Sequence, residues 1–138
     1  MATDEAQARL IRESLTLVRE RLQPASDAFY DNLFALAPEL RDLFRPDLGG
    51  QGMRFMTTLV TIAELIDAPA ALDREVTALA RAHRGIGVRA AHFVPIGSAL
   101  MVTLGEALGS GFTCELQEAW RSAYERFATM MIERGGFD

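Results

Sequence analysis

The stretch EVTALARAHRGIGV, residues 75–88, is typical of a helix that ends at a histidine and continues into two glycines. At about 100° per residue, Val76, Leu79 and Ala80 lie on one apolar face, and His83 falls on the same face. Glycine often follows the last turn of a helix. The pattern therefore predicts a buried helix whose last turn directs His83, one of two histidines in the chain, toward the interior.

Helical periodicity continues through the rest of the chain, and no segment alternates with the two-residue period of a half-buried strand. Pro24, Pro38 and Pro95 stand where a helix tolerates proline, in a first turn. The stretches RPDLGGQG (45–52) and GSGFT (109–113) interrupt the pattern as loops do. The expected helices cover residues 4–21, 24–35, 38–44, 51–66, 67–83, 91–108 and 113–134. We therefore expect an all-α fold of about seven helices in one domain, residues 1–138.

Composition limits the class of protein. Of the 138 residues 49% are hydrophobic, which excludes a disordered chain, and the net charge of −5 argues against nucleic acid or an anionic membrane as partner. The single cysteine, Cys114, cannot form an intramolecular disulfide and favours a reducing compartment. No signal peptide is visible, and no run approaches the roughly 18 to 20 apolar residues of a membrane span. We expect a cytoplasmic protein.

His83 is the strongest candidate for chemistry, because the common catalytic and metal motifs are missing from the sequence. There is no phosphate-binding glycine motif, no His-x-x-x-His pair, no Cys–His cluster for zinc and no Gly-x-Ser-x-Gly turn. A histidine in a last helical turn also has a structural explanation, since it meets the negative end of the helix dipole and can cap a carbonyl. A ligand role requires further residues at matching places, and Tyr30, Phe44 and Gln51 are such residues.

Five motifs, taken in their order and spacing, carry a resemblance to a known family. They are FYDNLFALAPELRDLF (29–44), QGMRFMTTL (51–59), LARAHRGIGV (79–88), VPIG (94–97) and EAWRSAYERFATMM (118–131). Over about residues 8–134 the chain resembles the globin family, and most closely the bacterial single-domain globins and the haem domain of flavohaemoglobins. The resemblance implies a globin fold around a pocket for haem b, iron protoporphyrin IX.

The same resemblance implies a role for each residue of that pocket. His83 is implied as the proximal iron ligand, and Tyr30 and Gln51 as the polar pair on the opposite, distal side. Apolar and aromatic residues are implied around the macrocycle: Phe55 over its distal face, Phe44 stacked against it, and Leu79, Val88, Phe93 and Ile96 along the proximal side.

Charged and polar groups near the pocket mouth could meet the haem propionates, and Arg45, Arg84 and His92 are the candidates. His92 is the only histidine besides His83. Because it stands at the start of a helix, we expect a surface or propionate-facing role for His92 rather than iron ligation.

A single imidazole leaves the opposite axial position of the iron open, so the resemblance implies reversible binding of dioxygen and other diatomic gases. The Tyr30 hydroxyl and the Gln51 amide both donate hydrogen bonds, which stabilise oxygen that becomes partly negative on binding. We therefore expect a protein of oxygen binding or transport with slow oxygen release, rather than an enzyme.

Two alternatives stay open: a nitric oxide dioxygenase or peroxidase that works with a separate reductase, and a haem-free signalling or interaction module. Two departures from the flavohaemoglobin pattern weigh against self-contained oxidation chemistry. The sequence ends at Asp138, so we expect no flavin or nicotinamide reductase domain to follow. By the resemblance, Phe93 and Gly135 stand where flavohaemoglobins have a tyrosine and a glutamate beside the proximal histidine. The ring N–H of His83 is then expected to donate to a backbone carbonyl of its own helix.

Overall fold

The computed structural model describes residues 5–43, 59–66, 68–82 and 89–136, and within these ranges the chain is helical and contains no strand. The elements are α1 (Glu5–Glu20), α2 (Leu22–Leu36), the 3-10 turn η1 (Pro38–Leu43), α4 (Pro69–Ala82), η2 (Ala90–His92), α5 (Phe93–Leu108), η3 (Gly109–Gly111) and α6 (Cys114–Gly135). Residues 59–64 are also helical. The expectation of an all-α chain is confirmed for these residues, with helix boundaries that differ from the predicted ones by one or two positions.

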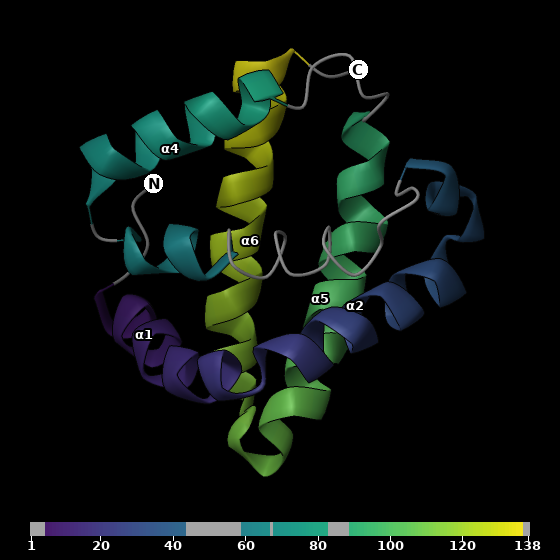
Figure 1. Ribbon diagram of the computed structural model, residues 1–138. Coiled ribbons are helices and arrows are strands. Elements are labelled where there is room, and N and C mark those ends of the chain that lie inside the picture. Colours follow the sequence, from purple (N-terminus) through teal and green to yellow (C-terminus); the bar gives the residue numbers. More distant parts are fainter. Residues whose placement is uncertain (1–4, 44–58, 67, 83–88, 137–138) are drawn as a thin grey trace.

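Helices α5 and α6 stand side by side, and the other helices cross them (Figure 1). α2 packs along α5, α4 packs against α6, and α1 contacts both α5 and α6. The apolar face of each helix supplies the core: Ile11 and Leu15 from α1, Phe29 and Leu33 from α2, and Leu100 from α5 are almost completely buried. This crossed arrangement follows from helices that each have one apolar stripe to cover.

The helical segment at residues 59–64 and the turn after it are buried on more than one side. Val60, Ile62, Ala63 and Ile66 are all buried. Their spacing places Ile62 on a different stripe from Val60 and Ala63. Burial on both stripes places this segment between neighbouring parts of the protein, while residues 51–58 lie outside the described residues.

Helix ends follow the local chemistry of the sequence. The Thr113 side chain accepts a hydrogen bond from the Leu116 backbone N–H at 3.2 Å, which confirms it as the N-cap of α6. α5 ends at Gly109, whose φ of +56° lies in the region that glycine occupies without strain. These two residues turn the chain between the two central helices.

α5 corrects one expectation. By length and composition the stretch Ala90–Gly111, with a mean hydropathy of 1.3 over its most apolar window, is long and apolar enough to cross a membrane. The sequence analysis expected no such run. Much of this hydrophobicity serves the fold, because Phe93, Leu100 and Leu104 are buried and the helix packs against α2 and α6. A helix at the centre of an all-α domain is apolar for that reason.

Candidate functional site

The predicted pocket residues divide into two groups. Tyr30, Leu79, Phe93 and Ile96 belong to the part of the chain that the structure describes. The implied ligand and four of its partners lie outside the described residues: His83, Phe44, Gln51, Phe55 and Val88. Arg45 and Arg84, the arginines considered for the propionates, also lie outside them. The roles of these seven residues stay predictions.

α4 is the helix that leads to His83, the predicted iron ligand. Val76 and Ala80 are completely buried, and Leu79 is half-buried and packs against the core. The predicted apolar face is therefore the buried face of α4. The helix ends at Ala82, directly before His83.

Tyr30 lies on α2 with 7% of its surface exposed, and its hydroxyl oxygen is buried. The neighbouring rings hold it on two sides. Phe34, one helical turn later, stacks against the Tyr30 ring with a centroid separation of 5.6 Å and an angle of 11°. Phe29 meets the same ring at 5.5 Å with an angle of 57°. These two ring contacts restrict the position of the Tyr30 side chain.

Phe93 and Ile96 lie in the first turn of α5, the helix that packs along α2. Phe93 is buried, and Ile96 is half-buried against the core. The backbone carbonyl of Phe93 accepts a hydrogen bond from the Tyr124 hydroxyl of α6 at 2.7 Å. α6 thus anchors the turn that carries two of the predicted proximal residues.

Tyr124 and Gly97 are the residues that sequence analysis did not assign to the site. A Cβ atom at Gly97 would lie 2.6 Å from Cε2 of Tyr124, so the tyrosine ring rests directly on the glycine backbone. Burial raises the pKa of Tyr124 well above its ordinary value, which keeps the hydroxyl protonated as a donor. The signal in the sequence was the glycine of VPIG inside an otherwise regular helix, since such a glycine often marks a close approach.

His92 has a local role at the start of α5. Its Nδ1 accepts a hydrogen bond from the backbone N–H of Arg89 at 3.0 Å, and its side chain is only half-buried. This hydrogen bond holds the ring by Nδ1 against the start of α5 and involves only one of the two imidazole nitrogens. The surface or propionate-facing role of His92 stays a prediction.

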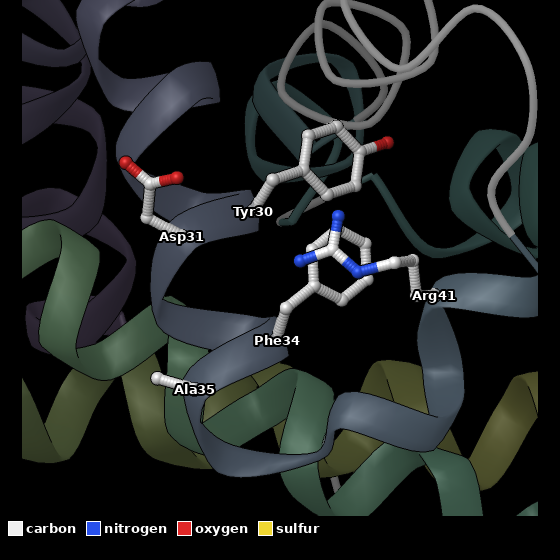
Figure 2. Close-up of a pocket in the computed structure, with 5 residues that line it drawn as sticks. All are labelled: Tyr30, Asp31, Phe34, Ala35 and Arg41. Carbon is white, nitrogen blue, oxygen red and sulfur yellow. The ribbon is translucent and has the colours of Figure 1, made fainter.

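A hollow lies on the outside of α2, next to Tyr30. It has a volume of about 380 Å³ and is lined by Tyr30, Asp31, Phe34, Ala35 and Arg41. Figure 2 shows the Arg41 guanidinium over the Phe34 ring, with the Asp31 carboxylate directed away from both. The guanidinium carbon is 4.5 Å from the Phe34 centroid, a cation–π contact. Nothing in the sequence pointed to a role for Arg41, because no local pattern links η1 to the Phe34 ring.

The described part of the chain supplies residue types that suit a haem pocket: apolar Leu79, Phe93 and Ile96 from α4 and α5, and the buried hydroxyl of Tyr30 from α2. A broad apolar group such as haem would suit these residues.

Comparison with known proteins gives the family. The globin family matches residues 27–131. A flavohemoprotein of Bordetella pertussis is 32% identical over 137 residues, which is 97% of this chain and 34% of that protein. A flavohemoprotein of Rhodopirellula baltica is 29% identical over 135 residues, 96% of this chain and 33% of that protein. The chain thus spans about a third of the length of these relatives.

A solved structure agrees with the fold. The hexacoordinated heme protein of an anhydrobiotic tardigrade superposes with a TM-score of 0.88 at 14% identity, over 96% of this chain and 95% of that one. The match confirms the predicted globin fold. The matched residues include Tyr30, the buried face of α4 and the Phe93–Tyr124 contact. The chain belongs to the globin family.

Proposed function

We propose that this globin binds haem b through His83 and reversibly binds dioxygen and other diatomic gases, with Tyr30 and Gln51 as hydrogen-bond donors on the distal side. The observation that carries the proposal is the buried Tyr30 hydroxyl, held by two aromatic rings on a helix that packs along α5. The family adds support, since globins bind haem and diatomic gases. When bound, haem would supply the iron at which a diatomic gas binds.

The chain's own residues then determine affinity. The buried Tyr30 hydroxyl would donate a hydrogen bond to a bound gas and stabilise negative charge there without reorganising water. A hydrogen bond to a charged group contributes about 1.5–3 kcal/mol, equivalent to roughly tenfold to a hundredfold in affinity. The aromatic rings around Tyr30 keep water away and so strengthen the bond.

The first test uses absorption spectra of the haem-reconstituted protein in its ferric, ferrous and oxygen-exposed forms. We expect a Soret band that changes with each form, and weak or altered haem binding in His83→Ala. Tyr30→Phe should release oxygen about ten to a hundred times faster, because it loses the donor but keeps the ring. His92→Ala is the matched control and should keep the wild-type spectra. Unchanged spectra in His83→Ala, or an unchanged oxygen release rate in Tyr30→Phe, would refute the proposal.

A second candidate function is the oxidation of nitric oxide to nitrate by dioxygen, with one electron per turnover from a separate reductase. The relatives favour it, because they are flavohemoproteins. Those proteins are about three times as long as this chain. The contacts of Phe93 weigh against it, since Tyr124 donates its hydroxyl proton to the Phe93 carbonyl and Phe93 itself has no polar side-chain group. Sustained nitrate formation with an added reductase and reductant would favour this second function. For either function we also propose a cytoplasmic location.

A further inference from the structure

The hydroxyl oxygen of Tyr30 is buried, yet the residue also lines the hollow of about 380 Å³ outside α2. A tyrosine side chain has two rotatable bonds, so a rotation could carry the ring from the interior into this hollow. In that position the hydroxyl would face water instead of the pocket.

Phe34 opposes this rotation. Its ring lies nearly parallel to the Tyr30 ring, at 11° and 5.6 Å, and only 9% of its surface is exposed. Because both residues lie on α2 four positions apart, their rings meet on one helix face. Phe34 also lines the hollow, and Figure 2 shows its side chain next to Tyr30 on the same side of α2.

Arg41 covers the Phe34 ring from a different element. Its guanidinium carbon is 4.5 Å from the ring centroid, and it extends from η1, which is fixed by the buried Leu40. The Leu40 backbone N–H donates to the Ala37 carbonyl at 3.0 Å, which ties η1 to the end of α2. Arg41, Phe34 and Tyr30 thus form one stack, with the cation at its solvent end.

We propose that Phe34 and Arg41 are positioning residues for Tyr30, which hold its ring inward and so determine whether the globin favours dioxygen over carbon monoxide. This rests on the proposed function of Tyr30 as a donor. Bound carbon monoxide carries little negative charge, so it gains little from the hydroxyl, whereas dioxygen gains much. Disrupting the stack of Arg41, Phe34 and Tyr30 lets Tyr30 turn outward, which weakens the binding of dioxygen more than that of carbon monoxide.

The position of the ring is measured in the haem-free full chain. The chain has only two tyrosines, Tyr30 and Tyr124, so selectively labelled tyrosine gives two sets of ring signals in NMR spectra. A soluble paramagnetic chelate broadens signals of exposed rings only. In Phe34→Leu we expect the population of outward Tyr30 to rise about two- to tenfold, while Tyr124 stays protected.

Phe127→Leu is the matched control, because Phe127 makes a ring contact with the other tyrosine, Tyr124, at 6.1 Å and 48°. It should leave the exposure of Tyr30 unchanged. Arg41→Ala should raise the outward population about two- to fivefold, and Arg41→Lys, which keeps a cation over the ring, should restore part of the protection.

The haem-loaded protein gives the second measurement. Oxygen release in Phe34→Leu should move toward the rate of Tyr30→Phe, with carbon monoxide release unchanged. If the exposure of Tyr30 and the ratio of the oxygen release rate to the carbon monoxide release rate are the same in Phe34→Leu as in Phe127→Leu, the positioning role is refuted. If instead Tyr30 turns outward in Phe34→Leu but Tyr30→Phe releases oxygen at the wild-type rate, the positioning holds and the proposed function of Tyr30 has failed.

Discussion

Gly97 is the residue on which the junction of the two central helices depends. The Tyr124 ring rests on its backbone, and the Tyr124 hydroxyl reaches the Phe93 carbonyl one turn earlier in α5. Any side chain at position 97 would occupy the place of the ring. The glycine therefore sets the distance between α5 and α6 at the turn that carries the predicted proximal residues.

Gly97→Ala should lower the free energy of unfolding by about 1–3 kcal/mol, because the added methyl group displaces the Tyr124 ring and its hydrogen bond. Urea denaturation followed by circular dichroism measures this. In a protein that also carries Tyr124→Leu, Gly97→Ala should lower the free energy of unfolding much less. Gly105→Ala on the same helix is the control: its Cβ would lie 3.5 Å from Phe112 Cδ2, an ordinary contact, and alanine there should be neutral or slightly stabilising. Equal effects at positions 97 and 105 would contradict the role of Gly97.

At the scale of elements, two polar contacts, one buried and one partly buried, fix how the helices cross. The Trp120 Nε1–H of α6 donates to the Ser14 hydroxyl of α1 at 3.0 Å, and that hydroxyl donates to the Ile11 carbonyl at 2.7 Å. Asn32 of α2 donates to the Thr103 hydroxyl of α5 at 3.1 Å. Apolar faces can slide past one another at small cost, but a buried donor loses its partner if the helices shift.

Ser14→Ala should therefore cost about 1–3 kcal/mol of stability, because it leaves the buried Trp120 N–H without its acceptor. Trp120 is the only tryptophan of the chain, so its fluorescence reports both the local change and the unfolding transition. Ser98→Ala, at an exposed position of α5, should change stability by less than about 0.5 kcal/mol. A Ser14→Ala protein as stable as the Ser98→Ala protein would show that the hydrogen bond does not hold α1 on α6.

At the scale of the whole molecule, the exposed ion pairs between distant segments contribute little. Arg19 pairs with Glu64, and Arg134 of α6 pairs with Asp73 of α4, each with side chains that are about half exposed. Each such pair contributes about 0–1 kcal/mol to the free energy of unfolding. The stability of the fold depends mainly on the buried apolar faces and, under the proposed function, on the haem between them.

Haem should raise the stability of the whole chain, since a ligand that binds only the folded state stabilises it by mass action. With free haem a thousandfold above its dissociation constant, the gain is about 4.1 kcal/mol. Thermal unfolding followed by far-ultraviolet circular dichroism, with and without haem, measures the shift. His83→Ala should lose most of it, and Cys114→Ser, at an exposed position on the first turn of α6, should keep it. Identical unfolding midpoints with and without haem would exclude a resident haem.

Much of the fold could be predicted from the sequence because its determinants are local. The apolar face of α4, the Thr113 cap and the break at Gly109 all follow from residues within a few positions of one another. The family could be inferred as well, from motifs that recur in order along the chain. The candidate site was predicted only in part: Tyr30 and Phe93 lie buried as expected, and the role of His83 stays a prediction.

The sequence by itself determined the helices, the face that each one buries, and the family, since periodicity and capping act within single turns. Only the tertiary structure decided which side chains meet between helices. Tyr124 reaches a carbonyl 31 positions earlier, Trp120 a hydroxyl 106 positions earlier, and Arg41 covers a ring on another element. These contacts depend on the angle and register at which packed helices cross, which no local pattern in one helix specifies.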